Sequence, residues 1–176
     1  MGHIEDLIDA AWQARREGRY EEAERGLRHA IEKTRQSGSR LELIRALKGL
    51  AHVLRDASQD GPALALYEEA VTLSREEGDI FLLAHTVRHL GDLHRHADRL
   101  SEADRCYSEA LTLYRTSVSP PWLDFANALR PAALLKERLG DNGGARVLWC
   151  EAQTFYQTAG VQQGVDECVK HLARLG

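Results

Sequence analysis

The sequence predicts an all-α protein, an α-solenoid of four helix-turn-helix repeats followed by a C-terminal capping helix. A small–large–small pattern recurs four times, and its first alanines lie 40, 40 and 42 residues apart. A fixed period of this length is typical of repeat architectures. No segment shows the strict alternation or hairpin signal of a β-strand protein. The four copies are Ala23-x3-Leu27-x2-Ala30, Ala63-x3-Tyr67-x2-Ala70, Ala103-x3-Tyr107-x2-Ala110 and Ala145-x3-Trp149-x2-Ala152.

Each period has room for two helices, helix A and then helix B, and the pattern lies on helix B. In the second period, apolar residues between Leu43 and Leu54 recur at helical spacing and predict one broad buried stripe on helix A. We therefore expect one domain over residues 1–176 with repeats at 4–38, 40–78, 80–117 and 122–160. The eight expected helices cover residues 4–17, 20–37, 40–56, 61–77, 80–97, 100–116, 122–139 and 142–159.

The ends of the B helices are also marked in the sequence. Gly38, Gly78 and Gly160 follow three of them, and glycine readily adopts the left-handed conformation that closes a last helical turn. In the third period two prolines, Pro120 and Pro121, stop the helix and favour an extended connection. A ninth helix over residues 161–175 is expected to cap the stack, with an apolar stripe of Val165, Cys168, Val169, Leu172 and Leu175.

Composition excludes several classes of function. The net charge of −4 disfavours a general nucleic-acid binder, because neutralising phosphates requires a basic surface. No apolar run approaches the roughly 20 residues of a membrane span. The N-terminus lacks the basic and apolar segments of a secretory signal, so we expect a cytoplasmic protein. The three cysteines have no paired spacing, which favours reduced thiols.

At these residues the chain resembles the tetratricopeptide repeat family. The helix-B pattern matches the family's small–large–small positions, and the third repeat, with Leu90-Gly91 and Leu100-Ser-Glu-Ala103, matches best. The period near 40 is similar to the longer repeats of kinesin light chains and many bacterial regulators. The resemblance implies a right-handed α-solenoid, a non-catalytic role, and a concave groove lined mainly by helix A.

The resemblance also implies which side chains face that groove, five on each helix A. These twenty positions carry nine Lys or Arg and four Asp or Glu, whereas the whole chain is acidic. A basic groove on an acidic protein favours acidic peptides. The alternative is a solvated, arginine-rich face without a ligand. The positions are Glu5, Ile8, Trp12, Arg15 and Arg16; Arg45, Lys48, His52, Arg55 and Asp56; His85, Arg88, Asp92, Arg95 and His96; and Asn127, Arg130, Leu134, Glu137 and Arg138.

From this set we predict a peptide-binding site. Lys48, Arg55, Arg88 and Arg95 occupy corresponding positions and would form two short basic ladders, since arginine grips a carboxylate with two hydrogen bonds. Asp92 would pair with Lys48 or Arg88 instead of binding a ligand. Trp12 is either a binding hot spot or a shield over the open end of the stack. The predicted residues are Trp12, Arg15, Arg45, Lys48, His52, Arg55, His85, Arg88, Asp92, Arg95, Arg130 and Arg138.

The family's carboxylate clamp is absent as a motif, because its asparagine positions hold Trp12, His52, Asp92 and Leu134 here. We therefore do not expect chaperone C-terminal peptides as ligands.

One cluster of histidines is a candidate metal site. His85, His89, Asp92 and His96 share one helical face, and two histidines one turn apart can bind zinc or nickel. Arg88 lies beside them and would repel a cation, so solvated histidines, or a groove that responds to pH, are the alternatives. No cysteine has an activating neighbour in sequence. We expect no enzyme activity, no cofactor and no metal.

The sequence thus favours a non-catalytic interaction module that binds an acidic protein or peptide segment. One alternative is a regulatory sensor domain that binds a small peptide or metabolite. A second is a self-assembling scaffold, and a metalloenzyme is the most distant. The expected partners are proteins or peptides, without nucleic acid or membrane, and the chain is expected to be a monomer or a weak homo-oligomer.

Overall fold

The computed structural model describes residues 2–117 and 119–176, and within them it contains nine helices and no strand. The chain divides into two compact units, Met1–Asp79 and Ile80–Gly176. None of the helices in the described ranges has the length and apolar character that a membrane span requires. The predicted all-α repeat fold is confirmed, whereas its organisation as one domain stays a prediction.

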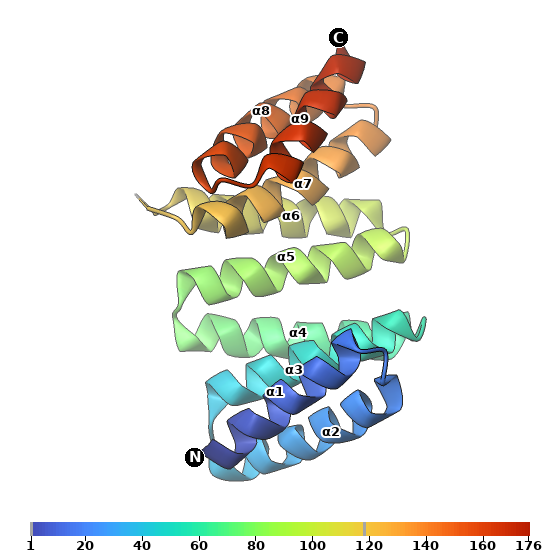
Figure 1. The fold of residues 1–176 in the computed structure, drawn as a ribbon, viewed down its shortest axis with the longest axis vertical. Helices are drawn as coiled ribbons and strands as arrows, with labels where there is room; N and C mark the ends of the chain where they lie inside the picture. The colour runs from blue at the N-terminus through green and yellow to red at the C-terminus, as the bar shows by residue number, and fades with distance from the viewer. Residues whose placement is uncertain (1, 118) are drawn as a thin grey trace. The chain divides into compact units, whose positions relative to one another are not determined.

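The first unit contains two helix pairs, α1 (Gly2–Arg16) with α2 (Tyr20–Ser37) and α3 (Arg40–Asp56) with α4 (Asp60–Glu77). Successive helices run back and forth as antiparallel neighbours (Figure 1). Helix α3 packs against α1, α2 and α4. It is accordingly the most buried helix of this unit, and every residue from Ala46 to Leu54 is buried.

The second unit contains α5 (Ile80–His96), α6 (Leu100–Arg115), α7 (Trp122–Arg138), α8 (Asn142–Thr158) and α9 (Gln162–Leu175). The bounds of all nine described helices agree with the predicted ranges to within two residues. Helix α9 packs against α8 and takes the place expected for the capping helix. Its approach depends on Gly164, where an added Cβ would lie 2.5 Å from the ring of Tyr156.

The repeated small–large–small pattern forms the core of each helix pair, as predicted. All its alanines are buried, and the large residues Leu27, Tyr67, Tyr107 and Trp149 are at most 1% exposed. Burying one large side chain contributes about 1.5–3 kcal/mol to folding. The alanines let the partner helix approach closely enough for these large residues to fill the space between the backbones.

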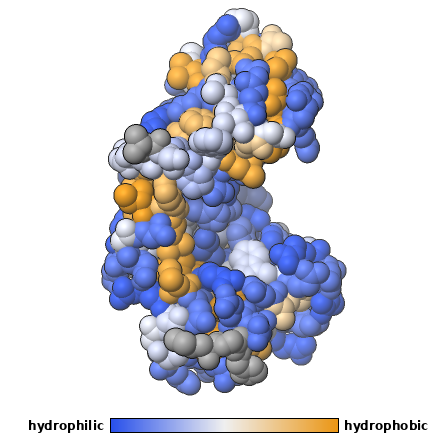
Figure 2. Space-filling view, turned by 60° about the vertical axis from the view of Figure 1, so that its left-hand side comes forward, coloured by the Kyte–Doolittle hydropathy of each residue, from blue (hydrophilic) through white to orange (hydrophobic). Residues whose placement is uncertain are grey.

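One part of the predicted capping stripe is wrong. Val165 and Cys168 are buried on the α8 side, but Val169 is half-exposed on another face of α9. Val147 of α8 is exposed as well. Figure 2 shows apolar side chains gathered over the C-terminal helices at the top of the view. The apolar residues of α9 therefore divide between a buried and a solvent-facing side.

The turns explain where the helices end. Gly38, Gly78 and Gly160 have φ of 74°, 78° and 71°, which confirms the left-handed stops predicted after the B helices. A second set of left-handed residues, not predicted, lies between helices A and B of each repeat. Gly18 and Gly140 occupy two of these turns, but Ser58 and Asp98 adopt φ of 59° and 61° in the others. A side chain at such a position is strained.

Candidate peptide-binding surface

The predicted site residues fall into two sets, one in each unit. Six lie on α1 and α3, which contact each other, and six lie on α5 and α7, which also contact each other. One position of the wider groove set, Ile8, is fully buried in the core and cannot meet a ligand. The first set is Trp12, Arg15, Arg45, Lys48, His52 and Arg55, and the second is His85, Arg88, Asp92, Arg95, Arg130 and Arg138.

A repeated hydrogen bond positions one polar side chain on helix A in three of the four repeats. The Tyr67 hydroxyl lies 2.8 Å from Nε2 of His52, and the Tyr107 hydroxyl donates to Asp92 over the same distance. In the fourth repeat Trp149 Nε1 donates to Glu137 at 2.6 Å. The large core residue of helix B therefore ends in a polar group that fixes a side chain on helix A.

In the first unit this contact lies within an aromatic row. The ring centroids of Trp12 and His52 are 5.4 Å apart, and those of His52 and Tyr67 are 5.6 Å apart, both edge to face. The guanidinium of Arg15 lies over the Trp12 ring, 5.7 Å from its centroid. His52 is buried, whereas Trp12 keeps partial exposure. The row thus leaves Trp12 partly exposed while His52 and Arg15 hold its ring in place.

Two groups of charged residues flank this row. At one end, Asp56 accepts from two guanidiniums, Arg15 at 2.7 Å and Arg55 at 3.3 Å. We call these three residues the Arg15–Asp56–Arg55 cluster. It carries one excess positive charge, and the two arginine side chains are only 21% and 26% exposed.

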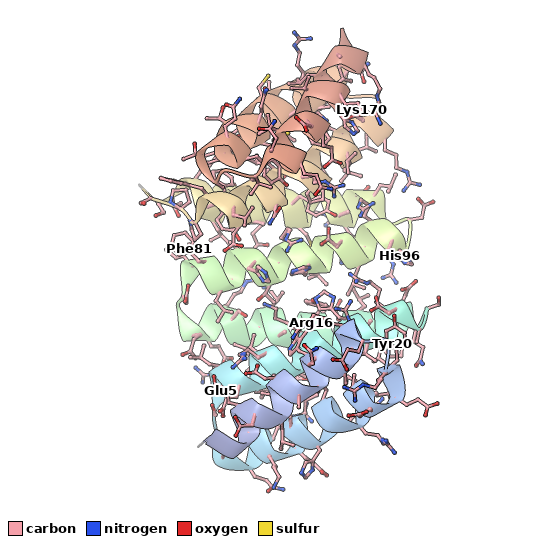
Figure 3. The ribbon with its side chains drawn as sticks, in the orientation of Figure 1. Glu5, Arg16, Tyr20, Phe81, His96 and Lys170 are labelled. Carbon is pink, nitrogen blue, oxygen red and sulfur yellow. The ribbon has the colours of Figure 1, made fainter. Side chains whose placement is uncertain are left out.

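At the other end, Arg45 pairs with two carboxylates, Glu5 at 3.1 Å and Asp9 at 2.7 Å. Glu5 lies near the start of α1 (Figure 3). This group carries one excess negative charge, so the two ends of the surface differ in sign. Lys48, which lies on α3 between them in sequence, is buried. Of the predicted cations in the first unit, Arg15 and Arg55 are the ones in a net positive environment.

In the second unit Asp92 is a shared acceptor. It accepts hydrogen bonds from Arg88 at 3.1 Å and from the Tyr107 hydroxyl at 2.8 Å. The ring Nδ1 of His89 lies 3.3 Å from the same carboxylate. The Arg88 pairing agrees with one of the two alternatives left open by the sequence. Arg95 donates to the Tyr107 hydroxyl at 3.2 Å. Burial and the charge of Asp92 raise the pKa of Tyr107, so its hydroxyl stays protonated and donates.

The remaining predicted cations of this unit bind carboxylates outside α7, one on α9 and one in the turn between α5 and α6. Arg130 makes two parallel hydrogen bonds of 2.7 Å to Glu167 of α9, and Arg138 pairs with Asp98. The hydrogen bonds that Arg130 donates to Glu167 raise the pKa of Arg130. These contacts join segments about one repeat apart in the chain. They fix α7 to its neighbours and leave these guanidiniums less available to a ligand.

The histidine cluster does not form a recognisable metal site. The rings of His85 and His89 meet edge to face with centroids 4.6 Å apart, and Arg88 lies 2.6 Å from Nε2 of His89. Within residues 2–117 and 119–176, no group of three or more His, Cys, Asp or Glu side chains is arranged to hold a metal ion. The response of this cluster to pH stays a prediction.

Sequence analysis missed one polar centre, at Glu137. This carboxylate accepts from Trp149, from His171 at 2.6 Å and from Arg174 at 2.7 Å, and the His171 ring stacks on Trp149. Burial raises the pKa of Glu137, but these hydrogen bonds outweigh it and hold the pKa below its ordinary value. The sequence does contain a signal for this contact: in three repeats, a polar helix-A residue precedes the helix-B aromatic residue that binds it by 12 to 15 positions.

Comparison with known proteins supports the family and the fold. Residues 11–76 match the tetratricopeptide repeat family, which confirms the resemblance. No curated protein sequence matches the chain. Aspartyl phosphate phosphatase F from Bacillus subtilis shares 15% identity with a TM-score of 0.88, over 95% of this chain and 43% of that protein.

Two further structures are similar over nearly the whole chain. BtubC (BKLC) from P. vanneervenii shares 19% identity with a TM-score of 0.74, over 98% of this chain and 79% of the other. A Podosopora anserina putative kinesin light chain with nearly identical TPR-like repeats shares 14% identity with a TM-score of 0.62, over 98% and 94% of the two chains. At these identities the similarity shows the fold alone.

Proposed function

We propose that this protein, whose residues 11–76 are tetratricopeptide repeats, is a non-catalytic interaction module that binds an acidic segment of another protein. The family itself supports a protein-interaction role. The acidic character of the partner, the binding residues, the lack of catalysis and the cytoplasmic location are our proposals. The binding surface is the exposed side of α1 and α3 around Trp12.

The Arg15–Asp56–Arg55 cluster is the observation that carries this proposal. A guanidinium has five N–H donors, and a single carboxylate shared by two arginines leaves several of these donors unused. A glutamate or aspartate of the partner would supply the missing acceptor. Because both arginines are mostly buried, their charge is less screened by water than that of a fully exposed side chain.

Trp12 adds an apolar contact beside this charge. Its ring is held between Arg15 and His52, so little conformational entropy is lost when a partner covers it. Tryptophan and arginine are the residue types most often found as binding hot spots. A segment with a carboxylate next to an apolar or aromatic side chain matches this arrangement.

The internal ion pairs change the ranking of the predicted residues. Arg88 and Asp92 bind each other, and Arg130 binds Glu167 through two nitrogens, Nε and Nη2, so these residues mainly fix the scaffold. Arg15 and Arg55 rank ahead of them as ligand contacts.

A peptide titration tests the proposal. The probe is a fluorescein-labelled peptide with adjacent glutamate and tryptophan residues, and its counterpart carries lysine in place of glutamate. We expect Arg55→Gln to weaken binding of the acidic peptide about tenfold or more, because a charge-assisted hydrogen bond contributes about 1.5–3 kcal/mol. Arg16→Gln is the matched control, since Arg16 is exposed on α1 and donates to Gln13 of its own helix.

Equal binding of the acidic and basic peptides, or unchanged affinity in Arg55→Gln, would remove this surface as the binding site. Circular dichroism of each variant checks that helicity is unchanged. If a small metabolite raises the melting temperature and no peptide does, the sensor alternative replaces the proposal.

A further inference from the structure

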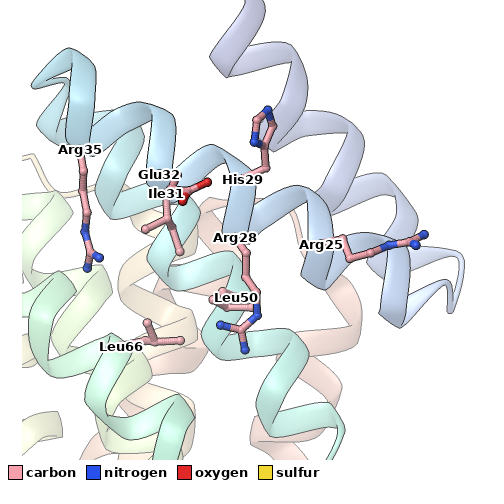
Figure 4. A pocket seen from close by; sticks show the side chains of 8 residues that line it. All are labelled: Arg25, Arg28, His29, Ile31, Glu32, Arg35, Leu50 and Leu66. Carbon is pink, nitrogen blue, oxygen red and sulfur yellow. The ribbon is translucent and has the colours of Figure 1, made fainter.

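A second groove lies in the first unit, away from the Trp12 surface. Helices α2 and α4 both pack against α3, and beside them is a cavity of about 520 Å³ (Figure 4). Its lining comes mainly from α2, with one residue each from α3 and α4. The lining residues are Arg25, Arg28, His29, Ile31, Glu32, Arg35, Leu50 and Leu66.

The floor of this groove is apolar. Ile31 of α2 and Leu50 of α3 are nearly fully buried, and Leu66 of α4 is partly exposed beside them. These three side chains come from three different helices, so the packing of the unit creates the floor. An apolar side chain of a partner that covered Leu66 would gain about 25 cal/mol for each Å² removed from water.

Two arginines stand above this floor, two helical turns apart. Figure 4 shows Arg28 and Arg35 extending from α2 on the side of Leu50 and Leu66. Seven residues of α-helix span about 10 Å, so the two side chains leave α2 at the spacing of residues i and i+7 of a second helix lying alongside. Arg25 lies one turn earlier on α2 and is exposed.

The present partners of these arginines can be exchanged. Arg28 pairs with Glu24 of its own helix at 2.8 Å, and Arg35 pairs with Glu69 of α4 at 2.8 Å. The two guanidinium side chains are 59% and 55% exposed. Ion pairs this exposed contribute only about 0–1 kcal/mol, so a carboxylate that also brings apolar contact can replace them.

We propose that this groove binds an amphipathic helix of a partner protein, with acidic residues seven positions apart on either side of a leucine-like residue. The carboxylates meet Arg28 and Arg35, and the apolar side chain covers Leu66 above the buried Ile31 and Leu50. This inference is independent of the proposed function, because none of these residues belongs to the Trp12 surface.

The test uses a synthetic helical peptide with two glutamates seven positions apart and leucines between them, titrated into the full chain and followed by amide NMR. We expect shifts confined to α2, α4 and the middle of α3, and an affinity about tenfold or more weaker in the double variant Arg28→Gln/Arg35→Gln. Glu69→Gln should strengthen binding several-fold, because it releases Arg35 from its internal partner.

Three controls make the outcome decisive. Arg55→Gln should leave this affinity unchanged, which separates the groove from the Trp12 surface. A peptide with lysine in place of both glutamates should not bind, and one with serine in place of the leucines should bind weakly. Absence of shifts at α2 and α4, unchanged affinity in the double variant, or weaker binding in Glu69→Gln would each overturn the inference. Shifts at α1 that disappear in Arg55→Gln would report binding at the Trp12 surface instead.

Discussion

Tyr107→Phe tests whether the polar ends of the core aromatic residues stabilise the helix-A surface. The change removes one hydroxyl, which donates to Asp92 at 2.8 Å and accepts from Arg95 at 3.2 Å. The ring is 1% exposed, and phenylalanine keeps its shape, so the surrounding apolar contacts are retained. The measured effect therefore reports on the hydrogen bonds.

The expected loss is about 2 kcal/mol of unfolding free energy, since a hydrogen bond to a charged group contributes about 1.5–3 kcal/mol. Tyr67→Phe is the matched comparison, because Tyr67 is equally buried and its hydroxyl meets an imidazole nitrogen of His52 rather than a carboxylate. We expect Tyr67→Phe to lower the free energy of unfolding by about 1 kcal/mol. Tyr20→Phe, at an exposed tyrosine, should change nothing measurable.

Urea denaturation followed by circular dichroism gives these free energies by linear extrapolation. If the two compact units unfold separately, Tyr107→Phe should shift only the transition of Ile80–Gly176, and Tyr67→Phe only that of Met1–Asp79. A loss in Tyr107→Phe below about 0.5 kcal/mol, or no larger than in Tyr67→Phe, would refute the reasoning, because the carboxylate bond would then contribute no more than an ordinary one.

Three further predictions concern backbone strain, pH and thiol reactivity. Ser58→Gly should raise the unfolding free energy by about 0.5 kcal/mol in urea denaturation, because the strain of a left-handed serine exceeds the entropy cost of glycine. The hydrogen bond from Arg130 holds the pKa of Glu167 below its ordinary value, so its stabilisation is present at neutral pH and lost as pH falls through the folded-state pKa. Glu167→Gln should flatten the decline in melting temperature below about pH 4.3, the ordinary glutamate pKa. Burial raises the pKa of Cys168 to about 11, whereas Cys150 is exposed, so iodoacetamide should label Cys150 in the folded protein and Cys168 only after unfolding, as read by mass spectrometry.

Each of these has its own contradicting result. Gly18→Ala is the opposite change at an equivalent turn and should cost about 1 kcal/mol; a neutral effect would contradict the strain argument. If the melting temperature of Glu167→Gln falls with decreasing pH as steeply as that of the wild type, carboxylates other than Glu167 control the loss of stability in acid. Labelling of Cys168 at the rate of Cys150 would show that α9 opens readily in the native state.

Much of the fold was predictable because its signals are local in the chain. A helix repeats every 3.6 residues, so the stripe from Leu43 to Leu54 and the pattern at Ala63, Tyr67 and Ala70 identify helices and their buried faces without knowledge of the neighbours. The helix bounds followed for the same reason. Val169 was assigned to the buried side of its helix, but it is half-exposed. Helical spacing does not determine whether an apolar residue at the edge of a stripe is covered by a neighbouring helix.

The candidate site was predictable only in part. Its positions on helix A were implied by the resemblance to the tetratricopeptide repeat family, but the expected basic ladders did not account for internal partners. Arg15 meets Asp56 and Arg138 meets Asp98, each about one repeat away in sequence. Such pairs depend on how one helix is placed beside the next, and the choice among several nearby acids is a matter of side-chain geometry.

The sequence by itself determined the helical repeat, the helix ends and the residues at the core, because helical periodicity, small-residue spacing and turn chemistry act over a few residues. Tertiary structure alone decided which charges remain available. It placed Asp56 between two arginines, bound Arg130 to Glu167, and opened the groove above Leu50 between α2 and α4. The physical reason is that electrostatic balance and cavities depend on distances between helices, which the sequence pattern does not contain.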